Sequence, residues 1–96
     1  MKNINVSFKA LNDEVRLSIL EMLKEGELCA CDILENLSIS QSTLSHHMKL
    51  LYESELVNVR KESKWSHYSI NQKTMKVLED YLHSFSSIKI ESNSSC

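Results

Sequence analysis

Apolar residues recur at helical spacing along the first part of the chain. A short amphipathic segment closes at residues 8–11, and Asn12 or Asp13 can cap the helix that follows, which stops at Gly26. The apolar positions of that helix are Val15, Leu17, Ile19, Leu20, Met22 and Leu23. The pattern therefore predicts two helices before Gly26.

Two more helices follow, joined by a short polar turn. One spans about residues 30–37, and Ser40 can cap the next, which runs to about Glu53. The positions that we expect to face inward are Ile33, Leu34 and Leu37 in the first helix and Leu44, Met48 and Leu51 in the second. This pair predicts a helix-turn-helix unit.

The period changes after Leu56. Residues 56–61 and 65–70 are β-prone runs on either side of a polar tip at residues 62–64, as in a hairpin. A last helix, about residues 72–86, places Met75, Leu78, Tyr81, Leu82 and Phe85 on one face. The order α-α-α-α-β-β-α predicts a mainly α, winged helix-turn-helix domain over residues 1–88, with a flexible C-terminal tail at residues 89–96.

Composition agrees with a small helical domain. The chain has 96 residues, no Pro, one Gly and 42% hydrophobic residues, and a core of this size is often completed by a second subunit. No apolar run approaches a membrane span, and the N-terminus lacks the apolar centre of a signal peptide. We therefore expect a dimer in the cytoplasm, where the three cysteines would stay reduced and available as ligands.

Charge is unevenly distributed, although the net charge is only −2. Residues 38–68 carry a net +1 and three of the four histidines, whereas residues 1–37 carry −3 and residues 69–96 carry 0. A balance of +1 is a weak electrostatic basis for DNA binding, so two subunits would have to combine their phosphate contacts.

The polar face of the second helix of the helix-turn-helix carries groups that can read DNA. Side chains pointing away from its apolar stripe are Gln41, Ser42, Thr43, Ser45, His46 and Lys49. These types can bond to base edges or phosphates in a major groove, and Arg60, Lys61 and Lys64 of the wing suit phosphate or minor-groove contact. The alternative is a solvated helix face and hairpin tip. His47, Trp65 and Tyr68 fit a core or an interface better than DNA contact.

Two cysteines separated by one residue stand just before the helix-turn-helix. Residues i and i+2 of a regular helix point to nearly opposite sides, so Cys29 and Cys31 cannot both bind one ion from within a helix. Chelation would therefore require a distorted helix start, with Cys29 at or before the helix N-terminus. Because this helix braces the reading helix, such a distortion would change DNA binding.

Several motifs together resemble the ArsR/SmtB family of metalloregulatory repressors, in particular its arsenic-sensing branch. They are the Leu-Cys-Ala-Cys-Asp box at residues 28–32, the Gln-Ser-Thr-Leu-Ser-His run at 41–46 and the Lys-Trp-Ser-His-Tyr run at 64–68. The likeness extends over about residues 6–86. It implies a homodimer, joined through its first and last helices, that represses an efflux or detoxification operon and leaves the operator when an inducer binds.

The resemblance leaves the inducer open. Arsenite and antimonite favour trigonal thiolate sites, but the third cysteine of the arsenic-sensing branch is replaced here by Leu34. Cys96 could supply the third thiolate from the tail of either subunit, or a small exogenous ligand could. Cadmium and lead sensors draw cysteines from an N-terminal extension, and no cysteine precedes Cys29. Asp80 and His83 offer only one incomplete acid/His pair for zinc.

The sequence thus favours a repressor that binds double-stranded operator DNA, expected to be an inverted repeat, without a cofactor, and responds to As(III) or Sb(III) through Cys29, Cys31 and Cys96. The same fold could instead respond to cadmium, lead or thiol oxidation. A thiol-redox enzyme is disfavoured because Cys-x-Cys is not Cys-x-x-Cys and no βαβ pattern surrounds it. A winged helix that binds only protein is the remaining alternative.

Overall fold

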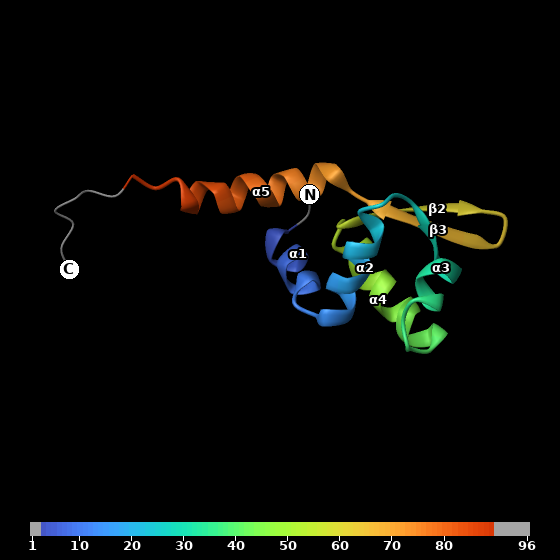
Figure 1. Cartoon of the computed structure of the whole chain (residues 1–96). Helices are drawn as coiled ribbons and strands as arrows, with labels where there is room; N and C mark the ends of the chain where they lie inside the picture. Colours follow the sequence, from blue (N-terminus) through green and yellow to red (C-terminus); the bar gives the residue numbers. More distant parts are fainter. Residues whose placement is uncertain (1–2, 90–96) are drawn as a thin grey trace.

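The computed structural model describes residues 3–89 and contains five helices and three strands within that range (Figure 1). In chain order they are α1 (Ile4–Leu11), α2 (Glu14–Leu23), β1 (Leu28–Cys29), α3 (Ala30–Glu35), α4 (Gln41–Glu53), β2 (Val57–Glu62), β3 (Trp65–Ile70) and α5 (Gln72–Ser86). This is the predicted mainly α architecture with a hairpin wing. The predicted tail at 89–96 lies, beyond its first residue, outside the described residues.

Side-chain caps begin the helices where the sequence places short polar residues. Asp13, rather than Asn12, caps α2: its Oδ2 accepts from the backbone N–H of Arg16 at 3.0 Å. Ser40 caps α4, as predicted, by accepting from the backbone N–H of Thr43 at 3.1 Å. The start of the reading helix is therefore fixed by local hydrogen bonds.

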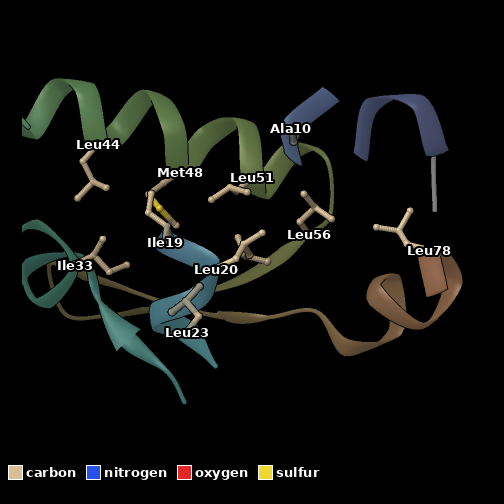
Figure 2. Close-up of a cluster of buried hydrophobic side chains, with 11 residues drawn as sticks. Ala10, Ile19, Leu20, Leu23, Ile33, Leu44, Met48, Leu51, Leu56 and Leu78 are labelled. Carbon is tan, nitrogen blue, oxygen red and sulfur yellow. The ribbon is translucent and has the colours of Figure 1, made fainter. Parts of the chain in front are cut away.

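The core lies between α2 and α4, and α1, α3 and α5 each add one buried side chain to it (Figure 2). Its fully buried members include Ile19 of α2, Ile33 of α3, and Met48 and Leu51 of α4. Leu78 reaches this cluster from α5, at 5% exposure. The predicted stripe of α4 is confirmed, whereas Leu17, one of the apolar positions of α2, is 46% exposed.

The sheet contains a strand that the sequence did not predict. β1 pairs antiparallel with β3, which also pairs with β2, so the strand order is β1-β3-β2. In the register, Leu28 lies opposite Tyr68 and Cys29 opposite His67. The wing is therefore continuous with the cysteine segment, and α3 ends at Glu35 rather than at residue 37.

The wing turn requires an unusual backbone conformation. Ser63 has φ of 61°, in the left-handed region that favours glycine. The hairpin forms nevertheless, with all six residue pairs of β2 and β3 in register from Val57 opposite Ile70 to Glu62 opposite Trp65.

The last helix extends away from the rest of the protein (Figure 1). Its apolar side chains other than Leu78 are mostly exposed, and the large exposed ones are Val77, Tyr81, Leu82, Phe85 and, just after the helix, Ile88. Phe8 of α1 contacts this surface, with its ring 6.0 Å from that of Tyr81. Within residues 3–89, no helix is long and apolar enough to cross a membrane.

Candidate thiol site and nucleic-acid interface

Cys29 and Cys31 lie at the junction of β1 and α3. Cys29 is the last residue of β1 and the N-cap of α3, with an extended backbone at φ −81° and ψ 159°. It lies outside the helix, and its Cα is 5.3 Å from that of Cys31. Two cysteines at i and i+2 within one helix would point to opposite sides, but here only Cys31 lies in α3. The two sulfurs therefore meet without unwinding any turn of that helix.

The structure joins these two cysteines by a disulfide. Our expectation that both would stay reduced is wrong for this form of the protein. The physical reason is that Cys29 has an extended backbone before the helix, so its side chain is not held on the face of α3 opposite Cys31. Cys96, the predicted third ligand, lies outside the described residues.

Asp32 is the third polar side chain at this junction. Among residues 3–89, only Cys29, Cys31 and Asp32 form a group of three or more His, Cys, Asp or Glu residues whose ligand atoms all lie within 4.8 Å of one another. The Asp32 carboxylate also accepts from the backbone N–H of Cys29 at 3.4 Å, so it stabilises the start of α3. The sulfurs are the ligands that soft elements prefer.

An ion pair connects the cysteine segment to the wing. Glu27, just before β1, accepts two hydrogen bonds from Arg60 of β2, at 2.7 Å from Nη2 and 3.2 Å from Nε. Hydrogen bonding from this guanidinium lowers the pKa of the Glu27 carboxyl, and the same pair raises the pKa of Arg60. Glu62 adds a further contact to Arg60 at 3.5 Å.

The predicted DNA-contacting face of α4 is open to solvent. All six of its members, Gln41, Ser42, Thr43, Ser45, His46 and Lys49, are exposed. They lie on the side of α4 that faces away from its buried stripe, to which Leu44 and Met48 belong. The structure therefore makes this face available to a DNA groove.

The predicted cations of the wing have different surroundings. Lys61 and Lys64 are exposed, and the Lys64 ammonium lies 5.7 Å from the centre of the Trp65 ring. Arg60 is also exposed but is held by Glu27 and Glu62. Phosphate binding by Arg60 would therefore compete with two carboxylates, whereas no carboxylate contact is recorded for either lysine within the described chain.

His47 packs inward, as predicted, and belongs to a polar cluster that holds three helices together. Arg16 of α2 donates from Nε to the Ala10 carbonyl of α1 at 2.7 Å, and its Nη1 lies 3.0 Å from His47 Nδ1. Since guanidinium can only donate, Nδ1 is the acceptor of this hydrogen bond. No local pattern indicates this role of Arg16, because its partners lie in α1 and α4.

The two wing aromatics differ from each other. Tyr68 packs against the core and is half-buried, as predicted, whereas Trp65 is 47% exposed within one protomer. Of the two predicted places for Trp65, the core is therefore excluded, whereas an interface stays a prediction; Trp65 is the first residue of β3, next to the wing turn. Asp80, the acid of the incomplete zinc pair, forms an ion pair with Lys76 at 3.2 Å on exposed α5. Among the described residues, Asp80 and His83 belong to no group of three possible metal ligands.

Comparison with known proteins identifies the family. Residues 13–59, from the cap of α2 into β2, match the model described as "Bacterial regulatory protein, arsR family". The arsenical resistance operon repressor of Staphylococcus aureus is 43% identical over 95 residues, which cover 99% of this chain and 88% of that protein. The chain belongs to the ArsR family. Another relative, the cadmium resistance transcriptional regulatory protein CadC homolog of Staphylococcus aureus, is 40% identical over 79 residues, which cover 79% of this chain and 65% of that protein.

Solved structures of the ArsR family have the same fold. A crystal structure of an ArsR family transcriptional regulator superposes with a TM-score of 0.82 at 19% identity, covering 86% of this chain and 91% of that one. The solution structure of a homodimeric winged helix-turn-helix DNA-binding domain from Mycobacterium bovis gives a TM-score of 0.71 at 24% identity, with coverage of 97% and 86%. The predicted winged helix-turn-helix fold is thus confirmed.

Proposed function

We propose that this ArsR-family protein is a transcriptional repressor that binds its operator through α4 and the wing and releases it when arsenite or antimonite binds Cys29 and Cys31. One observation carries the proposal: the two sulfurs lie where β1, paired with the wing, meets α3, which leads to the reading helix. The similarity to an arsenical resistance operon repressor along almost the whole chain supports it.

The ligand set of this proposal is two thiolates at the β1 and α3 junction, with Cys96 as the candidate third. Two adjacent sulfurs fit a thiophilic trivalent ion, and Asp32 is already used by the backbone N–H of Cys29. A bound ion would fix both sulfurs relative to each other and so change the backbone between β1 and α3. DNA binding needs no ligand in this scheme.

Coupling from the thiols to the DNA face has two short routes. Any movement of Cys29 is transmitted to His67 of β3 through the strand pairing, and any movement of Glu27 reaches Arg60 of β2. A hundredfold loss of operator affinity requires about 2.7 kcal/mol, within the usual range of coupling free energies. A rearrangement of a few contacts is therefore sufficient.

The active species in this proposal is a homodimer joined through α1 and α5. The apolar side chains of α5 from Tyr81 onward are exposed in one protomer, with Phe85 at 56%. A face of this kind is expected to be covered by another copy of the chain. Two reading helices would then face successive half-sites of an inverted repeat.

The test is fluorescence anisotropy of the DNA upstream of the chain's own gene, titrated with reduced protein in the presence and absence of arsenite. We expect tight binding that arsenite reverses. Binding that arsenite leaves unchanged would contradict the proposed inducer, and absence of specific binding would contradict the proposed DNA interface.

A second candidate is a repressor released by thiol oxidation, which the disulfide between Cys29 and Cys31 favours. It predicts that an oxidant such as diamide releases the operator and that arsenite added to the reduced protein does not. The similarity to a cadmium resistance regulator adds cadmium to the same comparison. Parallel titrations with arsenite, cadmium and diamide distinguish the three.

His46→Ala should weaken binding to the operator more than binding to random DNA, because a major-groove contact to a base edge carries sequence information. We expect a loss of about five- to a hundredfold on the operator, from the usual size of one specific base contact, measured by anisotropy on both DNAs. The matched control is His83→Ala, which removes an exposed histidine of α5. An equal loss on both DNAs would mean that His46 contacts only the backbone.

Glu27→Gln should reduce the coupling between inducer and operator without removing either binding activity, since it breaks the charge pair with Arg60. The ratio of operator affinities with and without arsenite should fall about two- to fivefold, as expected for one exposed ion pair. Glu21→Gln is the control, because it breaks the exposed pair with Lys24 on α2, away from the wing. An unchanged ratio in Glu27→Gln would show that the coupling does not pass through this pair.

A further inference from the structure

A cavity of about 320 Å³ lies between the reading helix and the wing, and neither cysteine lines it. Its volume is near the lower end of the range for pockets that hold small organic molecules. The helix contributes side chains at positions i, i+3, i+4 and i+7, which share one face of α4. They are Ser45, Met48, Lys49 and Tyr52. The opposite wall is one face of the hairpin, because alternate residues of a strand point the same way. Its members are Val59 and Lys61 of β2 and Ser66 and Tyr68 of β3.

The inner wall of this cavity is apolar. Met48 is 2% exposed and belongs to the core, and Tyr68 packs against that core. Val59 lies directly opposite Tyr68 in the hairpin. Tyr52, in contrast, is 52% exposed, so much of its ring is available to a planar ligand. An apolar group placed in the cavity would lose contact with water against these side chains, which is favourable.

The open side of the cavity is positively charged. Lys49 of α4 and Lys61 of β2 are both exposed, and no carboxylate lines the cavity. Arg60 belongs to the other face of the hairpin, where two carboxylates hold it. The hydroxyls of Ser45 and Ser66 line the cavity as well and can donate hydrogen bonds. An anion would therefore meet two cations and two hydroxyls without a carboxylate that competes for them.

We propose that this cavity binds a small organic anion with an apolar body, of the class of aromatic carboxylates, and that the bound anion competes with operator DNA. The apolar body would lie against Met48 and Tyr68, and the carboxylate would accept hydrogen bonds from Lys49 and Lys61. A DNA phosphate needs the cations but not the apolar wall, so the wall favours a ligand that has both parts. The competition rests on the proposed DNA interface, whereas binding of the anion does not.

Competition follows from the residues that the cavity shares with the DNA-contacting surface. Ser45, Lys49 and Lys61 line the cavity and are also among the proposed DNA contacts. A carboxylate between the two lysines would neutralise them and would repel a phosphate. At about ten times its dissociation constant, a competing ligand lowers operator affinity about tenfold for each cavity that must be emptied. The operator could thus be released without any change at the thiols.

The first experiment measures binding of sodium naphthoate to the DNA-free full chain, whose methionine methyl groups are isotopically labelled for NMR. Met48 lines the cavity, whereas Met22 and Met75 do not, and Met48→Leu assigns its resonance. An aromatic ring beside Met48 shifts that resonance by its ring current. We expect half-saturation near about 1 mM, from the usual binding free energy per atom of small ligands. The resonances of Met22 and Met75 should stay in place.

Two control ligands test the two parts of the proposed anion. Naphthamide keeps the rings and lacks the charge, so it should shift the Met48 resonance at least fivefold less than naphthoate at the same submillimolar concentration. Sodium acetate keeps the charge and lacks the rings, so it should not shift that resonance. All titrations are made at constant ionic strength, because exposed charges are screened by salt.

Variants test which side chains hold the anion. Lys49→Gln and Lys61→Gln should each weaken naphthoate binding at least threefold in the methyl titration. Tyr52→Ala should also weaken it at least threefold, because the exposed ring is lost. The matched control is Lys73→Gln, which removes an exposed lysine of α5 that does not line the cavity, and it should leave naphthoate binding unchanged.

The second experiment measures operator anisotropy with naphthoate at about ten times its measured dissociation constant, against the same concentration of acetate. We expect at least a tenfold loss of operator affinity with naphthoate only. The loss should be the same in Cys29→Ser, because the cavity does not include the thiols. A loss that disappears in Cys29→Ser would overturn the proposed competition.

The remaining outcomes separate this inference from the proposed function. A Met48 resonance that does not move, or that naphthamide moves as much, would overturn the inference and leave the proposed function standing. Unchanged naphthoate binding in both Lys49→Gln and Lys61→Gln would overturn it too. If these variants lose operator affinity while naphthoate does not bind, the cavity serves a DNA phosphate only. Absence of specific operator binding would overturn the proposed function, and the methyl titration would still decide whether the anion binds.

Discussion

Replacing Cys29 by Ser should leave operator affinity within about twofold of the unchanged protein and raise the arsenite concentration needed for release at least a hundredfold. The serine hydroxyl can occupy the N-cap position of α3, where short oxygen-bearing side chains are preferred. It cannot replace a thiolate on a soft ion. Anisotropy of the operator, titrated with arsenite at fixed protein concentration, measures both quantities.

The matched control for this prediction is Ala30→Ser, which places the same hydroxyl between the two cysteines and keeps both sulfurs. This variant should respond to arsenite as the unchanged protein does. Normal release in Cys29→Ser would exclude the β1 and α3 junction as the inducer site. Loss of DNA binding in Cys29→Ser would instead mean that the sulfur is needed for the fold.

Phe85→Asp should convert the dimer to a monomer and lower operator affinity at least a hundredfold. Phe85 is 56% exposed, and its ring meets that of Tyr81 edge-on at 5.1 Å, so the two present one apolar surface on α5. A buried unpaired carboxylate at such a contact is strongly unfavourable. Sedimentation equilibrium gives the oligomeric state, and anisotropy gives the loss of DNA binding.

The control for the dimer is His83→Asp. Residues advance about 100° each along a helix, so position 83 lies on the side of α5 opposite Phe85. A carboxylate there should leave the dimer and its operator affinity unchanged. If Phe85→Asp remains dimeric, α5 does not form the interface, and the exposed apolar face needs another partner.

The sequence alone predicted most of the fold because apolar spacing and caps act locally. Ser40 and the stripe of Leu44, Met48 and Leu51 determined the reading helix, whose limits match the structure. β1 was missed because two residues have no detectable period, and a strand of that length exists only through its pairing with β3. Alternation along β3 could not decide between core and interface for Trp65, because it does not show how much of the strand one protomer covers.

The candidate site was predicted less completely than the fold. The exposed face of α4 follows from helix geometry, so its members could be named in advance. The pairing of Glu27 with Arg60 joins residues 33 positions apart and depends on the place of β1 beside the wing. No local pattern encodes that place, so Arg60 was assigned to DNA without its carboxylate partner.

The shortness of β1 has a consequence for how fast the protein could respond. Only two residue pairs attach it to β3, whereas β2 and β3 share six. Such a short edge segment can open locally while the rest of the domain stays folded. The cysteine segment can therefore change its conformation at the rate of local opening, and the barrier to global unfolding need not be crossed each time the inducer arrives or leaves.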